Sequence, residues 1–423
     1  MRRLIVPLAS FEATDPDRFG SKAANLARLG RAGLPIPDGF CVDAEAYRIQ
    51  VAALGLEKIA HGVNAVEPGT ARRAALAMRL GLFDHPIVPE VLEPLLDARR
   101  QLVERTNALT VVRSSALVED RFGSSFAGQF ESYLGLEDET DFITAVRSCW
   151  AALWSTRVLR YMATHDASPA DTAMAVLVQP LVSARISGGG LSRTSDGDMV
   201  LNATWGLGSA IAQGEVVPDR IVLTRDGVLR KTMAGRIFHR VGCAHRTRSI
   251  SHSHSSKPCL NAAQVFELGR LLHQVEDIMG LPVEIEWAQD DGGFKLLQAR
   301  PLHLEPTRVP DAIWLRHPGL NGHPAGVGWG SGRACVVNCE CELARVAPGD
   351  VLVTKVAGPA LSAVLPRVAG LVAELGGSTS HLASLARERG IPMVLGVLDA
   401  TQRIPDGVQI AVDGVAGVVR WMR

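Results

Sequence analysis

The sequence lacks an excess of charge of one sign and any long apolar run. Its 44 Lys and Arg balance 44 Asp and Glu, whereas proteins that bind nucleic acid or anionic membranes usually carry a basic excess. No apolar run reaches the roughly 18–20 residues that cross a bilayer. We therefore expect neither nucleic acid nor membrane among its partners.

Cysteine and aromatic residues are also scarce. Seven cysteines are an odd number in a chain of 423 residues, which argues against a disulfide framework. The apolar residues 4–8 are too few for a signal peptide and acidic residues follow them at once, so we expect a cytoplasmic protein. Aromatic residues make up only 5% while glycine reaches 41 residues, which indicates tight turns and close backbone approaches, often to ligands.

The length suggests two or three domains, at about 150 residues each. Residues 1–105 alternate turns with helical patterns, and residues 106–302 combine strands with glycine-rich loops. A proline-bearing linker is expected at 303–320, followed by a compact α/β unit at 321–423. The expected strands lie at 109–113, 174–179, 200–203, 220–224, 351–354, 370–374 and 393–395, and the expected helices at 23–29, 261–279 and 381–389.

The strongest chemical signal is the segment GGSTSH at 376–381. It predicts a glycine turn, a hydroxyl N-cap and a helix that begins at His381 and ends at Gly390. The first helical turn favours anions and mildly disfavours a cation, so the imidazole tends to be neutral and nucleophilic. Such a histidine suits phosphoryl acceptance; the alternative is an ordinary surface histidine at a helix start.

A second signal is a predicted β-hairpin, with strands at 283–288 (VEIEWA) and 294–301 (FKLLQARP). Glu284 and Glu286 share one face of the first strand. If residues 291–293 form the loop, Glu286 lies opposite Gln298. The carboxylate and amide oxygens could then hold Mg²⁺, with Arg300 beside them for phosphate oxygens. The alternative is a half-exposed hairpin with solvated charges.

Two weaker signals precede the hairpin. The strand 111–115 ends in Arg113 and two serines, and a Gly/Ser loop follows at 123–131; together they form a reasonable phosphate cradle, although the sequence holds no Walker A motif. The turn at 20–22 puts Lys22 at a helix start, where an isolated lysine is more often solvated.

Other candidates favour ordinary structural roles. Cys335, Cys339 and Cys341 have no second Cys/His pair at a usual zinc spacing, so we expect free thiols. His252 and His254 lie in a polar stretch expected to be a mobile loop. Trp150 and Trp154, four residues apart on a helical pattern, are expected in the core.

Taken in this order, the motifs resemble the phosphoenolpyruvate synthase / pyruvate phosphate dikinase family. The similarity extends over eight segments in register, at 20–40, 111–136, 149–157, 176–182, 206–219, 283–301, 349–355 and 376–396. The resemblance implies an ATP-grasp domain with N-terminal (1–105) and C-terminal (106–302) subdomains. A hinge linker (303–320) and a swivelling phosphohistidine domain (321–423) would follow.

The resemblance also implies roles for individual residues. It places Lys22 and Arg113 on the nucleotide phosphates. Glu286 and Gln298 would hold Mg²⁺, Arg300 would grip the reacting phosphates, and His381 would be the phosphorylated nucleophile. The strand that meets the adenine through its backbone comprises Gln179, Pro180, Leu181 and Val182.

The implied chemistry has two halves. His381 attacks the β-phosphoryl group of ATP, expels AMP and keeps a pyrophosphoryl group, whose terminal phosphate then passes to water or inorganic phosphate. The phosphohistidine domain next swings away and gives its phosphoryl group to an acceptor.

The sequence departs from the family pattern in ways that bear on the acceptor. It ends just after an expected last strand at 417–421, without the barrel that binds pyruvate or phosphoenolpyruvate in the family. Leu382 and Ser384 replace an alanine and an aliphatic residue, which is expected to alter the surface presented to the acceptor. The resemblance implies a nucleotide loop at 188–194, but this segment lacks the bulky residue that usually follows the glycine turn.

Three interpretations therefore stay open. The chain is an autonomous phosphotransferase that acts on a small molecule, or a catalytic subunit that phosphorylates itself and needs a separate acceptor-binding chain. The third is a non-catalytic ATP-binding module. An ATP-grasp ligase, which would release ADP, gives no reason for the histidine domain.

Overall fold

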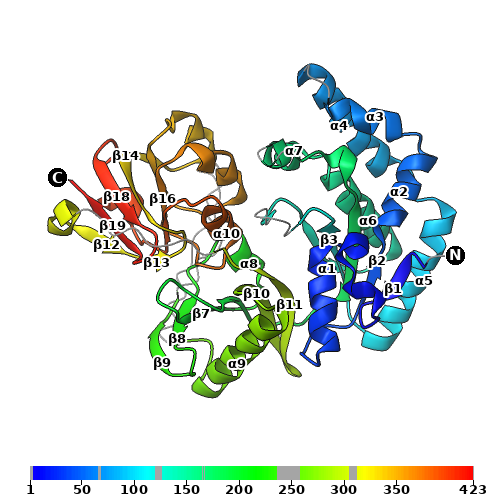
Figure 1. Ribbon diagram of the computed structural model, residues 1–423, viewed down its shortest axis with the longest axis horizontal. Coiled ribbons are helices and arrows are strands. Elements are labelled where there is room, and N and C mark those ends of the chain that lie inside the picture. The colour runs from blue at the N-terminus through cyan, green and yellow to red at the C-terminus, as the bar shows by residue number, and fades with distance from the viewer. Residues whose placement is uncertain are drawn as a thin grey trace. The chain divides into compact units, whose positions relative to one another are not determined.

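The computed structural model describes residues 3–64, 68–119, 126–163, 165, 167–235, 258–303 and 312–422. The predicted mobile loop with His252 and His254, Asp120 and residues 123–125 lie outside these ranges. The chain divides into two compact units (Figure 1). Unit 1 comprises 1–183 and 295–300, and unit 2 comprises 184–294 and 301–423.

Unit 1 is a five-stranded sheet with the order β1-β2-β5-β3-β4, accompanied by helices. Its strands are β1 (Ile5–Pro7), β2 (Phe40–Val42), β3 (Thr110–Ala116), β4 (Ser132–Leu136) and β5 (Met174–Pro180). Its helices are α1 (Pro16–Arg31), α2 (Ala44–Ala53), α3 (Glu57–His61), α4 (Pro68–Asp84), α5 (Pro89–Thr106), α6 (Glu139–Ala152) and α7 (Thr156–Ala163). Trp150 and Trp154 are fully buried, which confirms their predicted place in the core.

Unit 2 contains two sheets. The first has the order β11-β10-β6-β7-β8-β9. Its strands are β6 (Ile186–Leu191), β7 (Met199–Trp205), β8 (Asp219–Leu223), β9 (Leu229–Met233), β10 (Val283–Asp290) and β11 (Gly293–Pro301), and its helices are α8 (Ser209–Ala212) and α9 (Ala262–Met279). Residues 295–300 of β11 belong to unit 1. Asn261 and Gln264 cap α9 reciprocally, and Gly280 ends it in the left-handed region at φ 73°, so this predicted helix is confirmed.

The second sheet of unit 2 has the order β12-β19-β18-β14-β15-β16-β17-β13. Its strands are β12 (Gly319–Asn321), β13 (His323–Pro324), β14 (Trp329–Val337), β15 (Val351–Thr354), β16 (Gly370–Ala373), β17 (Met393–Leu395), β18 (Gln409–Asp413) and β19 (Val418–Trp421). The strands β14 to β17 run parallel. Helices α10 (His381–Glu388) and α11 (Ala400–Arg403) complete the α/β unit that the sequence predicts.

Short 3₁₀ helices join these elements. They lie at Glu12–Thr14, Gly62–Asn64, Pro169–Asp171, Ala312–Arg316, Glu340–Arg345, Pro359–Ala363 and Leu365–Arg367. Within the predicted linker, residues 312–320 form a 3₁₀ helix and the start of β12, and residues 304–311 lie outside the described ranges. The predicted division after residue 105 falls inside unit 1. The domain boundaries and the hinge therefore stay predictions.

The glycine segment 188–190 differs from its prediction. It was expected in a nucleotide loop, but it forms the middle of β6, between β7 and β10. Pairing on both sides supplies the backbone hydrogen bonds that a strand needs, which overrides the poor strand propensity of glycine. The hairpin of β10 and β11 is present, with the two residues 291–292 between its strands rather than the three expected.

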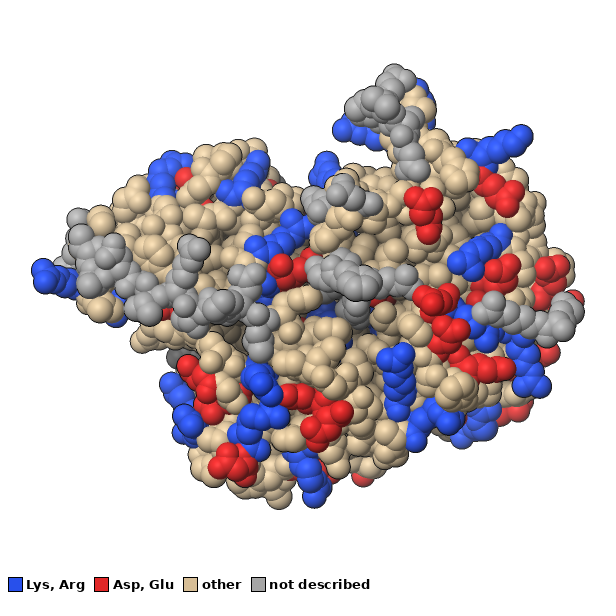
Figure 2. All heavy atoms as spheres, viewed as in Figure 1, with Lys and Arg blue, Asp and Glu red and all other residues tan. Residues whose placement is uncertain are grey.

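The surface carries both signs of charge. Figure 2 shows Lys and Arg interspersed with Asp and Glu over the face in view, which agrees with the equal totals in the sequence. Among the described helices, none is long and apolar enough to span a bilayer.

His323 gives the fold a testable dependence on pH. Burial, reinforced by the positive charge of Arg220, lowers the pKa of His323 to about 3. At pH values between the ordinary histidine pKa and this lowered pKa, His323 is protonated only in the unfolded chain. The free energy of unfolding should therefore fall with decreasing pH in that window, by up to about 1.4 kcal/mol per pH unit. Thermal unfolding from pH 7 to pH 4 measures the slope.

The variant His323→Leu should lose this part of the acid dependence. The exposed His61 provides the control, because His61→Leu should leave the slope unchanged. Equal slopes for His323→Leu and the unchanged protein would contradict the assignment.

Candidate functional site

The predicted lysine lies just after a break in helix α1. Gly20 has φ 72° and ψ 160°, which are not helical values. The hydroxyl of Ser115 on β3 bridges the break, because it donates to the carbonyl of Phe19 (2.6 Å) and accepts from the amide of Ala23 (3.2 Å). A Cβ at residue 20 would lie 2.4 Å from the carbonyl oxygen of Ser115. Only glycine permits this contact, which fixes α1 on β3.

Lys22 is buried rather than solvated. Its side chain is only 9% exposed, and its Nζ donates to the carbonyl of Ser114 (2.7 Å) and pairs with Glu119 (3.2 Å). The second carboxylate oxygen of Glu119 accepts from the amide of Ala116 (3.0 Å). A buried ammonium needs such an anionic partner. The alternative of an isolated, solvated lysine is therefore wrong.

Arg113 and Gln298 come together in unit 1. Arg113 is buried on β3 and donates to Oε1 of Gln298 (2.8 Å) and to the carbonyl of Leu297. Arg300 follows Gln298 by two residues on β11, so the two side chains share a face of the strand, and Arg300 is also buried. This part of the predicted site thus contains two buried guanidinium groups and an amide oxygen.

The predicted adenine-binding strand corresponds to the end of β5. Gln179 is buried and its Nε2 donates to the carbonyl of Pro37 (3.4 Å). Pro180 ends the strand, and Leu181 and Val182 follow it, all three half-buried. The amide of Leu181 donates to the carbonyl of Leu109 (2.7 Å), so that amide already has a partner within unit 1. The adenine contact itself stays a prediction.

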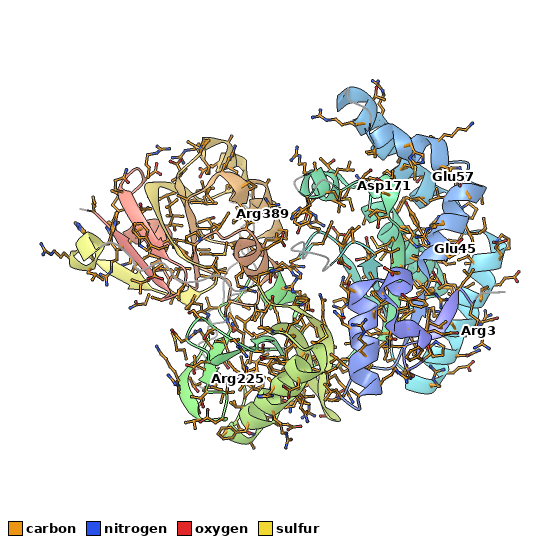
Figure 3. All side chains as sticks on the ribbon, in the orientation of Figure 1. Arg3, Glu45, Glu57, Asp171, Arg225 and Arg389 are labelled. Atoms are coloured by element: carbon orange, nitrogen blue, oxygen red, sulfur yellow. The ribbon has the colours of Figure 1, made fainter. Side chains whose placement is uncertain are left out.

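The histidine segment folds as the sequence predicts. Ser380 is the N-cap of α10, and its Oγ accepts from the amide of Ala383 (3.3 Å). His381 is the first residue of the helix and is half-buried. Arg389, labelled in Figure 3, is the C-cap, and Gly390 follows at φ 65°. A helix of two turns therefore presents His381 at its positive end.

The residues before His381 lie on the first sheet of unit 2. The Oγ of Ser378 donates to the amide oxygen of Asn202 on β7 (3.1 Å). The amide of Gly376 donates to the carbonyl of Val216 (2.9 Å). Thr379 lies so close to Gly189 that a Cβ on that glycine would come within 2.6 Å of the threonine Cβ. We call residues 376–380 the histidine loop.

Glu286 lies on the sheet face that meets the histidine loop. In the antiparallel pair of β10 and β6, Glu286 is directly opposite Gly189. Side chains of paired residues point to the same face of a sheet. The predicted metal ligand therefore shares the face on which Thr379 packs. Lys22, Arg113, Gln298 and Arg300 belong to unit 1, whereas Glu286 and His381 belong to unit 2.

Two features of this site could not be recognised from the sequence. Leu382 and Ser384 were expected to alter a surface presented to the acceptor, but both are buried. The Oγ of Ser384 instead contacts the carboxylate of Glu284 (2.8 Å). Glu119, the partner of Lys22, lies within the segment 111–136, but no role was predicted for it. Both contacts join residues about a hundred positions apart.

Among the remaining candidates, the three clustered cysteines lie on two neighbouring elements. Cys335 is buried on β14, while Cys339 and Cys341 lie at the start of a 3₁₀ helix. In the described parts of the chain, no group of three or more His, Cys, Asp or Glu side chains is placed to hold a metal ion.

The break at Gly20 provides a test of how α1 is attached. Gly20→Ala combines an unfavourable backbone conformation with a collision against Ser115, so we expect a loss on the order of 3 kcal/mol. Gly33 also has a positive φ, of 86°, but a Cβ there meets nothing within 4 Å. Gly33→Ala should cost about 1 kcal/mol from strain alone. Chemical denaturation of both variants measures the difference, and equal losses would contradict the contact.

Comparison with known proteins identifies the family. The model described as "Pyruvate phosphate dikinase, AMP/ATP-binding domain" matches residues 16–313, and that of the "PEP-utilising enzyme, mobile domain" matches residues 346–417. Two similar curated proteins are the phosphoenolpyruvate synthases of Pyrococcus furiosus (30% identical) and Aeropyrum pernix (33% identical). Each alignment covers 99% of this chain and 58% of the relative.

A likeness to a solved D-alanine-D-alanine ligase from Helicobacter pylori has 11% identity and a TM-score of 0.24, over 50% of this chain and 46% of that one; it is too low to support an argument. The match of the first family model extends over most of the sequence. The chain therefore belongs to the phosphoenolpyruvate synthase / pyruvate phosphate dikinase family.

Proposed function

We propose that this chain is an ATP-dependent dikinase-type phosphotransferase. In this proposal His381 takes the β-phosphoryl group of ATP, releases AMP and passes a phosphoryl group to an acceptor. The observation that carries it is the packing of the histidine loop on the sheet face that bears Glu286. The proposed nucleophile, at a helix N-terminus, would thereby lie on the part of the chain that matches the AMP/ATP-binding domain. Family membership supports the same chemistry.

The buried cations of unit 1 are proposed to bind the phosphates. Lys22, Arg113 and Arg300 are all less than 10% exposed, and charge interactions are stronger where water is excluded. The guanidinium groups match phosphate oxygens geometrically. The end of β5, from Gln179 to Val182, is proposed to meet the adenine through its backbone.

Glu286 and Gln298 are proposed to hold Mg²⁺. Carboxylate and amide oxygens are hard donors of the kind that Mg²⁺ prefers, and nucleotide phosphates commonly supply further ligands. The oxygen of Gln298 already accepts from Arg113, but an amide oxygen has a second lone pair. The ion would neutralise charge on the phosphates.

His381 then acts as the nucleophile. An imidazole nitrogen bonds to the β-phosphorus while the bond from that phosphorus to the oxygen of AMP breaks. The terminal phosphate leaves to water or inorganic phosphate, and phospho-His381 delivers its group after the domain moves at the hinge proposed within 303–320. The covalent intermediate divides one transfer into two easier steps.

The acceptor belongs to the proposal only as a class. This chain spans somewhat more than half the length of the curated relatives it matches, so their whole-protein activity is not carried over. The acceptor is proposed to be a small molecule or a separate domain. The second candidate, a catalytic subunit that needs an acceptor-binding chain, is favoured by the same partial coverage. A cytoplasmic location stays a prediction.

The first test is incubation of the purified chain with Mg-ATP. We expect AMP and an acid-labile adduct of one or two phosphoryl groups, seen by intact mass, because His381 forms a phosphoramidate bond. His381→Ala should abolish both products. Release of ADP without an adduct would contradict the proposal. If the chain binds ATP but forms neither AMP nor an adduct, the result would favour the non-catalytic module.

The second test concerns Mg²⁺. Glu286→Gln keeps the size of the side chain but removes its charge, so the Mg²⁺ concentration needed for half-maximal AMP formation should rise about tenfold or more. EDTA should stop AMP formation. The exposed Glu267 supplies the control, since Glu267→Gln should leave the Mg²⁺ dependence unaltered. An identical dependence in both variants would remove Glu286 from the metal site.

A further inference from the structure

A buried ion pair joins the histidine helix, α10, to the first sheet of unit 2. This sheet lies in the segment 16–313 that matches the AMP/ATP-binding domain, which we call the nucleotide-binding half. Arg387 on α10 donates from Nη2 to Glu284 on β10 (2.9 Å), and both side chains are 5% exposed. Glu284 lies within the segment that matches the AMP/ATP-binding domain, and Arg387 lies within the segment that matches the mobile domain. The pair therefore connects the two matched domains inside unit 2.

Both members of this ion pair make further hydrogen bonds. Arg387 also donates to the carbonyls of Ser378 (2.6 Å) and Ala325 (3.2 Å) and to the Oγ of Ser384 (3.1 Å). The hydroxyl of Ser384 donates to Glu284 (2.8 Å). Additional hydrogen bonds of this kind stabilise a buried ion pair, whereas loss of one partner leaves an uncompensated charge.

Gly189 allows the histidine loop to approach the same sheet. A Cβ at this strand position would lie 2.6–2.9 Å from three side-chain atoms of Thr379. A glycine in a strand interior weakens the strand, and here its missing side chain leaves room for Thr379. The close approach of the loop and the ion pair of Glu284 thus act on one face.

We propose that Glu284, Ser384 and Arg387, with Gly189 as the seat for Thr379, form a docking lock. The lock holds the histidine helix on the nucleotide-binding sheet in the position where His381 receives its phosphoryl group. These are positioning residues, because the proposal gives none of them a contact with the reacting atoms. The inference rests on the proposed function for its chemical meaning, but docking can be measured without any nucleotide.

Release of the helix requires this network to open. Glu284 and Arg387 must then replace their contact with each other by contacts with water. The hydroxyl of Ser384 must likewise replace the carboxylate of Glu284 by water. The strength of the lock is therefore expected to set how much of the protein holds His381 on the sheet. A weaker lock lowers the fraction ready to be phosphorylated and raises the fraction in which the helix is free to leave.

Amide hydrogen exchange, read by mass spectrometry without nucleotide, tests the lock directly. In Glu284→Gln and Ser384→Ala, peptides from 376–388 should exchange about tenfold faster, because a hydrogen bond to a charged group is lost. Glu276 is the matched control. It is a buried carboxylate that pairs with Arg193 (2.9 Å) and Arg225 (2.8 Å), all within the nucleotide-binding half. Arg225 is labelled in Figure 3.

Glu276→Gln should leave exchange at 376–388 unchanged. Glu284→Gln and Ser384→Ala should each unfold as one cooperative species, like the parent. If exchange at 376–388 is unchanged in both of these folded variants, the lock is overturned. Equal acceleration in Glu276→Gln would overturn it too, because loss of any buried carboxylate would then suffice.

A steric test is independent of charge. Gly189→Ala should accelerate exchange at 376–388, since its methyl group displaces Thr379. Gly190→Ala is the control, because the nearest atoms to its Cβ would belong to the core side chains of Ile285, Leu201 and Leu272, at 3.1–3.2 Å. Adding Thr379→Gly to Gly189→Ala should restore the slow exchange. Failure of this rescue, with the fold intact, would overturn the role of Gly189.

Single-turnover phosphorylation by Mg-ATP links the lock to chemistry. Glu284→Gln and Gly189→Ala should form phospho-His381 about tenfold more slowly than the parent. Slow exchange in the parent with no adduct would defeat the proposed function but keep the lock. Normal phosphorylation rates in variants whose exchange is fast would overturn the lock as a positioning device.

Discussion

Glu284 and Arg387 form an ion pair that is buried away from water, so each charge depends on the other for compensation. The pair is therefore stable only while β10 and α10 stay in contact. The same requirement shapes unit 1, where the buried ammonium of Lys22 reaches Glu119. In each unit a charge is tolerated in the interior because a distant segment supplies its partner. The positions of the candidate site residues thus follow from where buried charges are compensated.

Local signals in the sequence were sufficient for several parts of the fold. The serine N-cap, the helix that begins at His381 and the glycine after it were all predicted, because capping depends on residues within a few positions. The helix 262–279 followed from the same kind of signal. The hairpin that carries Glu286 was predicted from alternation, although its loop is one residue shorter than expected.

Other features depend on residues far apart in the chain, and no local pattern reveals them. Arg113 meets Gln298 across 185 positions, and Ser384 meets Glu284 across 100. The segment 188–190 was expected in a loop from the family resemblance, but strands on both sides impose the extended backbone. The roles of the site residues also depend on a nucleotide, so their chemistry stays proposed even where their placement agrees with expectation.

The glycine run of β6 has a mechanical consequence as well. Trp287, fully buried, packs over Gly188 on one face, and its indole donates to the carbonyl of Gly189 (3.2 Å). Thr379 packs on the other face, against Gly189. At Gly188 and Gly189 only the backbone of β6 separates the contacts on the two faces, because glycine has no side chain. A displacement of the histidine loop on one face is therefore expected to shift the backbone of β6 and, with it, the indole of Trp287 in the core on the other face.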